Sequence, residues 1–343
     1  MKEMTAQKPV PAMLAVDWGG TWCRMGLIDR HGEVLWQARR PNPRGGSRTD
    51  YLSLGASLLN EAFSVEDIRA LGIGIAVAGP VDPDSGILYQ PPNLMALDGI
   101  SLKRMWREQY GLPVLVGNDA NYAAVGEFHF GAGRDAAQAG HPPRSLFYVT
   151  VSTGIGGGAV MRVPGLPEPS LLLGANGLTA EVGHTTVDTA VGAPLCQCGK
   201  RGCLEAVSSG TAIANYARAA LAEGRHRDSA LAAIALEELS SRAVVAAGVQ
   251  GDAFANAVMS RACEGLAVGL ANMVHLFNPD LIILGGGVSE GLTQLNLLPT
   301  IRQGIHDRLM SELHKAFDLV PSVLGDNSGL LGAAAAAWEG SEL

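Results

Sequence analysis

Three cysteines and one histidine stand close together between residues 184 and 205. His184 is followed by Cys196, Cys198 and Cys203, with glycines and other turn-forming residues between them. Three thiolates and one imidazole make up the Cys₃His ligand set of a structural zinc site, which leaves no open position for a catalytic water. The alternative is a chance grouping, but three of the five cysteines lie within eight residues. The sequence therefore predicts a zinc ion that braces this turn-rich segment.

A second chemical feature is a glycine turn between two apolar, β-rich runs, and it occurs twice. The first copy, in residues 13–29, contains Asp17, Gly19, Gly20 and Thr21, and the second, in residues 146–161, contains Thr153, Gly154 and Gly156. Backbone N–H groups freed by such turns bind anions, and the hydroxyls add donors. Neither copy matches the dinucleotide or P-loop glycine pattern. The repeat predicts an internal duplication with two phosphate-binding turns facing each other across a cleft, whereas either turn alone could be an ordinary hairpin.

Other segments supply the elements that must position these turns. Residues 68–82 and 114–119 are expected to form strands, and residues 281–289 a buried strand that runs into a third glycine turn. Residues 120–128 and 330–338 are rich in Ala, and residues 207–277 are dominated by Ala, Leu, Glu and Arg at helical spacing. All three segments are expected to be helical. The pattern favours a mixed α/β protein.

Length, charge and hydropathy narrow the class of protein. A chain of 343 residues is long enough for about two domains. Its net charge of −8 offers no electrostatic footprint for nucleic acid or an anionic membrane. No run of apolar residues is long enough for a transmembrane helix, and the N-terminal run is too short for a signal peptide. We therefore expect a cytoplasmic protein in which Cys23 and Cys263 are buried hydrophobic residues and the other thiols bind metal.

Taken together, six motifs closely resemble the ROK family of sugar kinases, in the family's order and over nearly the whole chain. They are Asp17-x-Gly-Gly-Thr21, Asn118-Asp119-Ala-Asn121, Ser152-Thr-Gly-Ile-Gly-Gly-Gly158, Glu181-Val-Gly-His184, the cysteine motif Cys196 to Glu205, and Gly285-Gly-Gly-Val-Ser289.

This resemblance implies an α/β fold of two ribonuclease-H-like (actin-like ATPase) lobes with a cleft between them. The small lobe would comprise residues 1–117 and about 326–343, and the large lobe residues 118–325. The implied activity is ATP-dependent phosphorylation of an aldohexose at its 6-hydroxyl, with glucose as the expected substrate. N-acetylmannosamine, N-acetylglucosamine and fructose remain alternatives, as does polyphosphate in place of ATP. A homo-oligomer, dimer or tetramer, is expected.

The resemblance also assigns a role to each motif residue. Asp119 matches the catalytic base, although an Asn or Asp before an Ala-rich helix can instead be an N-cap. The implied sugar contacts on both lobes are Gly79, Asn93, Asn118, Asp119, Glu181, His184 and Glu205. Taken alone, Glu205 could be a solvated helix residue and Glu181 a capping-box partner. His184 would serve twice, with one ring nitrogen on zinc and the other facing the sugar.

The implied nucleotide contacts lie in the three glycine turns. Asp17 would organise Mg²⁺ through water, because this small ion keeps much of its hydration shell. Thr21 and Thr153 would hold phosphates. Glycines allow the backbone to approach the ligand closely; they are Gly19, Gly20, Gly154 and Gly156 for the phosphates and Gly285, Gly286 and Gly287 for the adenosine.

This chain departs from the family pattern at three places near the sugar. Thr179-Ala180 replaces the usual Ala-Gly before Glu181, the segment 162–173 is longer and richer in proline, and a tryptophan is missing after Asn93.

The motifs favour a kinase over a sugar-sensing regulator, a repressor or a zinc hydrolase. A sugar-sensing regulator would not need Asp119, and a repressor would carry a DNA-binding helix-turn-helix before the first glycine motif, which begins after about sixteen residues here. A zinc hydrolase would need an open metal position.

Overall fold

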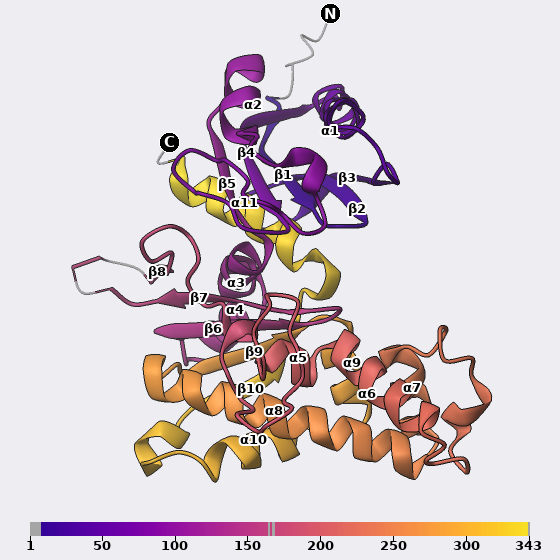
Figure 1. The fold of residues 1–343 in the computed structure, drawn as a ribbon. Coiled ribbons are helices and arrows are strands. Elements are labelled where there is room, and N and C mark those ends of the chain that lie inside the picture. Colours follow the sequence, from indigo (N-terminus) through magenta and orange to yellow (C-terminus); the bar gives the residue numbers. More distant parts are fainter. Residues whose placement is uncertain (1–7, 164, 167–168, 342–343) are drawn as a thin grey trace, which may run out of the picture. The chain divides into compact units, whose positions relative to one another are not determined.

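The computed structural model describes residues 8–163, 165–166 and 169–341. They form two units, each with its own sheet and helices (Figure 1). The first unit comprises Met1–Pro142, Leu171–Thr179 and Asp326–Leu343, and the second Pro143–Ser170 and Ala180–Gly325. Among the described residues, no helix is long and apolar enough to cross a membrane.

The sheet of the first unit has five strands in the order β3-β2-β1-β4-β5. β1 pairs antiparallel with β2 and parallel with β4, while β3 and β5 form the two edges. The strands are β1 (Val10–Trp18), β2 (Trp22–Ile28), β3 (Val34–Pro41), β4 (Ile68–Val77) and β5 (Val114–Asn118).

The sheet of the second unit repeats this arrangement, in the order β8-β7-β6-β9-β10. β6 pairs antiparallel with β7 and parallel with β9, which in turn is parallel to β10. The strands are β6 (Ser145–Val151), β7 (Ile155–Met161), β8 (Ser170–Leu171), β9 (Leu281–Gly285) and β10 (Asp318–Pro321). The identical strand order confirms the predicted duplication and the α/β class with two ribonuclease-H-like units.

The described residues of the first unit form the α-helices α1 (Arg48–Phe63), α2 (Leu102–Tyr110), α3 (Asp119–Phe130), α4 (Ala132–Gln138) and α11 (Ser328–Gly340). α11 packs on the sheet closely enough that a Cβ on Gly74 of β4 would lie 1.9 Å from the carbonyl oxygen of Ala333. α3 crosses α11 just as closely, since a Cβ on Gly332 would lie 1.7 Å from the carbonyl oxygen of Tyr122. Only glycine permits such contacts between backbones.

This packing moves the domain boundary away from its expected position. The sequence analysis placed the boundary before residue 118, so that the helix starting at Asp119 belonged to the large lobe. In the structure, α3 and α4 group with the first unit, whose last residue before the second sheet is Pro142. The long-range contact between α3 and α11 explains the difference.

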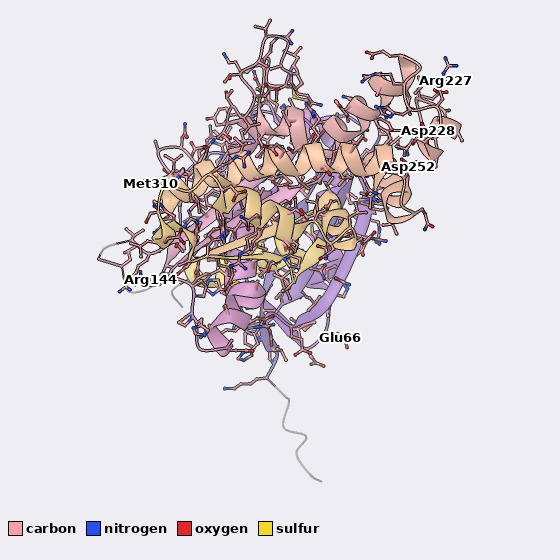
Figure 2. All side chains as sticks on the ribbon, turned by 90° about the horizontal axis from the view of Figure 1, so that it is seen from below. Glu66, Arg144, Arg227, Asp228, Asp252 and Met310 are labelled. Carbon is pink, nitrogen blue, oxygen red and sulfur yellow. The ribbon has the colours of Figure 1, made fainter. Side chains whose placement is uncertain are left out.

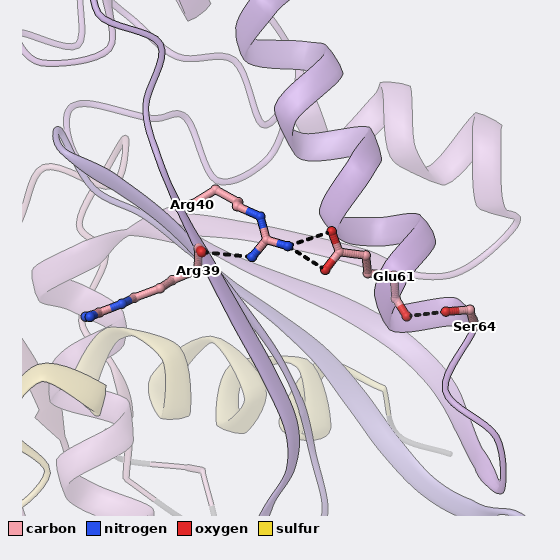
Figure 3. A network of polar contacts seen from close by, with 4 residues as sticks. All are labelled: Arg39, Arg40, Glu61 and Ser64. Carbon is pink, nitrogen blue, oxygen red and sulfur yellow. Dashed lines mark hydrogen bonds and ion pairs between the residues drawn. The ribbon is translucent and has the colours of Figure 1, made fainter.

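A polar network fastens the outer strand of the first sheet to helix α1 (Figure 3). Arg40 of β3 donates from Nη2 to both carboxylate oxygens of Glu61, at 3.0 and 3.1 Å. Its Nη1 donates to the carbonyl oxygen of Arg39, and the Ser64 hydroxyl donates to the carbonyl oxygen of Glu61. Because the ion pair is largely exposed, it contributes only about 0–1 kcal/mol to stability.

The second unit is built around the 25-residue helix α8, which starts at its N-cap Asp252. Figure 2 shows Asp252, with Arg227 and Asp228 nearby, at one end of this helix and Met310 towards the other end. The helices of the unit are α5 (Leu204–Ser208), α6 (Gly210–Ala222), α7 (Ser241–Val249), α8 (Ala253–Phe277), α9 (Gly287–Gln294) and α10 (Leu298–His306). The expected helical section 207–277 is therefore confirmed, with an irregular interruption between α6 and α7.

Short 3₁₀ helices complete the chain: η1 (Met95–Leu97), η2 (Val182–His184), η3 (Ala230–Ala233), η4 (Glu312–Lys315) and η5 (Gly325–Asn327). The cysteines outside the metal motif are buried as expected, Cys23 at 0% and Cys263 at 2% exposure. Burial raises the pKa of the Cys263 thiol to about 12. In the proline-rich segment 162–173, Pro164, Pro167 and Glu168 lie outside the described residues.

Candidate active site

The first glycine turn joins β1 to β2 and is held by a residue that sequence reasoning missed. The side-chain amide of Asn42 donates to the carbonyl oxygen of Gly19 at 2.8 Å and accepts the indole N–H of Trp18 at 3.1 Å. The Asn42 backbone N–H donates to the carbonyl oxygen of Thr21 at 2.8 Å. Asn42 therefore donates two hydrogen bonds to the turn and accepts one from Trp18, the last residue of β1. No local pattern in the sequence predicts these hydrogen bonds.

Asp17 lies at the end of β1 and is 5% exposed. Its carboxylate forms an ion pair with Arg24, with Nη2 and Oδ2 2.6 Å apart. Burial raises the pKa of Asp17, the Arg24 guanidinium opposes this effect, and the nearby Asp326 adds to it. A Cβ on Gly329 would lie 3.2 Å from the Asp17 carboxyl carbon, so this carboxylate stands beside the first turn of α11.

Three predicted residues of the first unit, Asp17, Gly79 and Asn118, lie at or just after the carboxyl ends of the parallel strands β1, β4 and β5. Asp17 pairs with Ala76 near the end of β4, and Val77 pairs with Asn118 at the end of β5. The side-chain amide of Asn118 donates to the carbonyl oxygen of Gly79 at 3.3 Å, which places these two predicted sugar contacts together. Ligands of open α/β sheets bind at this carboxyl edge.

Asn93 lies beside the first glycine turn. A Cβ on Gly20 would come within 2.6 Å of the Asn93 Cβ, so Gly20 leaves room for this side chain. A predicted sugar contact and a predicted phosphate contact are therefore neighbours in the first unit.

Asn118 and Asp119 occupy different positions of helix α3. Asn118 is the N-cap, because its Oδ1 accepts the N–H groups of Ala120 at 2.9 Å and Asn121 at 3.2 Å. Asp119 is the first residue of the helix, and its Oδ1 also accepts the Ala120 N–H at 2.9 Å. The N-cap role that the sequence allowed for this motif is therefore filled by Asn118.

Asn121 also has a structural task that the sequence motif did not reveal. It is 2% exposed, and its side-chain amide donates to the carbonyl oxygen of Gly177 at 3.2 Å. Gly177 packs against Val81 and Pro83. Asn121 therefore ties the helix that carries Asp119 to the segment that precedes Glu181 in the chain.

In the second unit, the second glycine turn joins β6 to β7 and is held from α5 and α6. The Ser152 N–H donates to the carbonyl oxygen of Gly154 at 2.9 Å, which closes the turn that contains Thr153. The N–H of Ile155 donates to Glu205 Oε2 at 2.9 Å. A Cβ on Gly154 would lie 2.5 Å from the same oxygen. The predicted sugar contact Glu205 thus reaches the predicted phosphate turn, where Gly156 follows in β7.

Glu181 and His184 are positioned by a tight backbone turn. Ala180 has φ of +68°, and the N–H of Val182 donates to its carbonyl oxygen at 2.7 Å across Glu181, whose φ and ψ are −69° and 56°. These angles are those of an inverse γ-turn. Desolvation of its carboxyl raises the pKa of Glu181, the Glu205 carboxylate adds to this, and His184 opposes it.

The four predicted metal ligands converge. Their ligand atoms all lie within 4.8 Å of one another, with Cys196 Sγ 3.7 Å from His184 Nδ1 and Cys198 Sγ 3.7 Å from Cys203 Sγ. Ligands at the usual zinc distances of about 2.3 Å for sulfur and about 2.0 Å for nitrogen lie about 3.5–3.8 Å apart in a tetrahedron. The residues present therefore fit a four-coordinate metal ion.

The third glycine turn follows β9, which pairs with β6. A Cβ on Gly286, whose φ is +86°, would lie 2.6 Å from the carbonyl oxygen of Val151, and one on Gly285 would lie 2.2 Å from the hydroxyl of Tyr148. Gly287 is the first residue of α9 and has open space beside it. Two of these glycines thus serve close packing, and the third leaves the start of α9 accessible.

Comparison with known proteins places the chain in a family, because the ROK family model matches residues 13–339. The chain belongs to the ROK family. It is 33% identical over 330 residues to the glucokinase of Thermotoga maritima, covering 95% of this chain and 97% of that protein. The crystal structure of a ROK family glucokinase from Streptomyces griseus, in complex with glucose and AMPPNP, superposes with a TM-score of 0.76 at 30% identity, covering 96% and 99% of the two chains.

A regulator of the same family is also similar. The crystal structure of a ROK family transcriptional regulator, a homologue of the E. coli MLC protein, superposes with a TM-score of 0.80 at 26% identity. The superposition covers 95% of this chain and 77% of that protein. Fold alone therefore does not separate a kinase from a regulator, and the site residues must decide.

Proposed function

We propose that this ROK family protein is an ATP-dependent hexose kinase that phosphorylates glucose at its 6-hydroxyl. The observation that carries the proposal is the position of Asp119. It is the first residue of α3, and the N-cap of that helix is provided by Asn118. A sugar sensor needs no general base, whereas phosphoryl transfer to a hydroxyl does. The glucokinase relatives, matched over nearly their whole length, support the same activity.

In this proposal Asp119 accepts the proton of the 6-hydroxyl as that oxygen attacks the γ-phosphorus of ATP. The N–H groups of the two glycine turns, with the hydroxyls of Thr21 and Thr153, hold the phosphates. Asp17 would hold a hydrated Mg²⁺ ion through its water ligands, and this ion would neutralise charge on the phosphates. Its ion pair with Arg24 supports this role by favouring the ionised carboxylate in a buried position.

Glucose itself would be bound by carboxylates, amides and an imidazole. A carboxylate can accept hydrogen bonds from two neighbouring hydroxyls, which suits Glu181 and Glu205 to a pyranose ring. On the first unit the proposed contacts are Gly79, Asn93 and Asn118, of which Gly79 and Asn118 are hydrogen-bonded to each other.

The Cys₃His cluster would hold a zinc ion. Zinc bound by four protein ligands is structural, and here it would fix the loop between His184 and Cys203. Because His184 faces Cys196 through Nδ1, its Nε2 is left for a sugar hydroxyl. The metal would thereby set the tautomer and orientation of this imidazole.

The alternative is a sugar-sensing protein without catalysis, and the similarity to the ROK regulator keeps it open. One assay separates the two. Release of ADP should be measured with ATP, Mg²⁺ and a panel of glucose, mannose, fructose, N-acetylglucosamine and N-acetylmannosamine, with polyphosphate as a second donor. We expect turnover that depends on Mg²⁺ and is fastest with glucose. Sugar binding in calorimetry without turnover of any sugar would overturn the kinase proposal.

We further propose that the protein is a homo-oligomer. Size-exclusion chromatography with light scattering tests this, and a mass of one chain at micromolar concentration would refute it.

A further inference from the structure

Glu205 contacts both the metal motif and the second glycine turn. Its Oε2 accepts the N–H of Ile155 at 2.9 Å, and its Oε1 lies 3.6 Å from Cys196 Sγ. These partners are separated by 50 and 9 residues from Glu205 in the chain. One carboxylate group therefore stands between a proposed zinc ligand and a proposed phosphate-binding turn.

The position of Glu205 is set by the metal motif. Cys203 is the N-cap of the short helix α5, and Glu205 lies in the first turn of that helix. The backbone around it is also fixed, because the N–H of Leu204 donates to the carbonyl oxygen of Thr185 at 2.9 Å. A metal ion bound to His184 and Cys203 would thus fix the two neighbouring backbone segments, at Thr185 and Leu204, that position Glu205.

The glycine turn is shaped to receive this carboxylate. Gly154 leaves room for Glu205 Oε2, which would lie 2.5 Å from a Cβ at this position. The start of α6 adds a second attachment, since Gly210 N–H donates to Ser152 O at 2.7 Å and the Thr211 hydroxyl donates to Thr153 O at 2.8 Å. The carbonyl groups of the turn are thus held by α6, while its N–H at Ile155 is held by Glu205.

We propose that Glu205 is a positioning residue for the phosphate donor, which makes nucleotide affinity depend on the metal site. This inference rests on the proposed function and extends it, because zinc and Glu205 would then act on ATP as well as on the sugar. A hydrogen bond to an ionised acceptor is stronger than one between neutral groups. Loss of the carboxylate should therefore loosen the turn even where α6 still holds its carbonyl groups.

Binding of a non-hydrolysable ATP analogue with Mg²⁺, measured by calorimetry in the absence of sugar, tests this coupling. We expect Glu205→Ala to weaken nucleotide binding at least fivefold and Glu205→Gln, which keeps an acceptor oxygen, to weaken it less. Glu181→Ala is the matched control: it removes another proposed sugar contact that has no hydrogen bond to the turn, so nucleotide affinity should stay within twofold. Unchanged nucleotide affinity in Glu205→Ala would show that this residue serves the sugar alone.

Hydrogen exchange at the Ile155 amide gives a readout that needs no activity. We expect slow exchange in the zinc-loaded full-length protein, and exchange at least tenfold faster in Glu205→Ala and after zinc is removed by chelation. The amide of Val149, inside β6, should stay protected throughout and reports that the unit is still folded. Equal exchange at Ile155 with and without zinc would overturn the coupling. Because neither readout involves turnover, a failure of the kinase proposal would be recognised separately in the hexose assay.

Discussion

Asn118 caps helix α3, and Asp119 is the first residue of that helix. The cap rests on two hydrogen bonds from the N–H groups of Ala120 and Asn121 to Asn118 Oδ1. Because Asn118 provides the cap, the helix does not depend on the Asp119 carboxylate for its start. The base and the cap can therefore be tested by separate substitutions.

Asp119→Asn should lower kcat about 10²- to 10⁴-fold, which is the usual contribution of a general base. Glucose affinity and the melting temperature should change little, because the asparagine keeps the size of the side chain and Asn118 still caps the helix. Steady-state kinetics measures kcat, calorimetry measures glucose affinity, and a thermal melt measures the melting temperature.

Asn118→Ala is the contrasting variant. It removes the cap and should lower the free energy of unfolding by about 1 kcal/mol. If Asp119→Asn retains more than a tenth of wild-type kcat, the role of Asp119 as a base is wrong.

Zinc analysis should find about one zinc per chain, as the closed Cys₃His cluster predicts. Cys198→Ser should lose both the metal and measurable glucose binding, because the loop that carries His184 and Glu205 is no longer held. Plasma mass spectrometry and calorimetry measure the two effects.

The control is Cys263→Ala, which changes a buried thiol on α8 outside the cluster. The Cys263→Ala variant should keep the zinc ion. Metal-free protein with full glucose affinity would refute the structural role of zinc.

Asn42→Leu should lower the free energy of unfolding by about 1–3 kcal/mol, since it leaves the buried indole N–H of Trp18 without a partner. It also removes the hydrogen bond to Gly19, so the KM for ATP should rise several-fold while the KM for glucose stays close to its wild-type value. Urea unfolding and initial rates provide the measurements.

Arg40→Ala offers a comparison in the same unit. It removes the exposed ion pair with Glu61 and the hydrogen bond to the Arg39 carbonyl oxygen, and neither contact involves the glycine turn. We therefore expect at most about 1 kcal/mol of destabilisation and an unchanged KM for ATP. Equal effects of the two substitutions would argue against a specific role of Asn42 in the turn.

Ala180 adopts a left-handed conformation, which costs a non-glycine residue about 1–2 kcal/mol. Ala180→Gly relieves that strain. It also makes the unfolded chain more flexible, which lowers the free energy of unfolding by about 0.4–1 kcal/mol. The free energy of unfolding should therefore change by less than about 1 kcal/mol, whereas the β-branched side chain of Ala180→Val should be clearly destabilising.

The same glycine variant tests sugar choice. We expect glucose to be preferred over N-acetylated and keto sugars, because the Ala180 side chain adds bulk next to Glu181. Removing it should raise kcat/KM for N-acetylglucosamine relative to glucose. A wild-type preference for either acetamido sugar would contradict the predicted substrate.

Much of the candidate site could be predicted because its parts are local in the chain. The four metal ligands lie within 20 residues, and the turns around Gly20 and Gly154 each join two strands that are consecutive in sequence. Composition and hydrophobic pattern also identified β1, β9 and α11, since these are long or strongly patterned segments. The duplication followed from two similar strand–turn–strand patterns, and the strand orders of the two sheets confirm it.

Tertiary packing decided what local pattern could not. Asn42 reaches Trp18 across 24 residues, Glu205 reaches Ile155 across 50, and α11 meets α3 about 200 residues away. The last contact assigns α3 to the first unit and moves the boundary from residue 118 to 142. Such hydrogen bonds and close backbone contacts exist only after the sheets and helices have packed, so no local spacing of residue types encodes them.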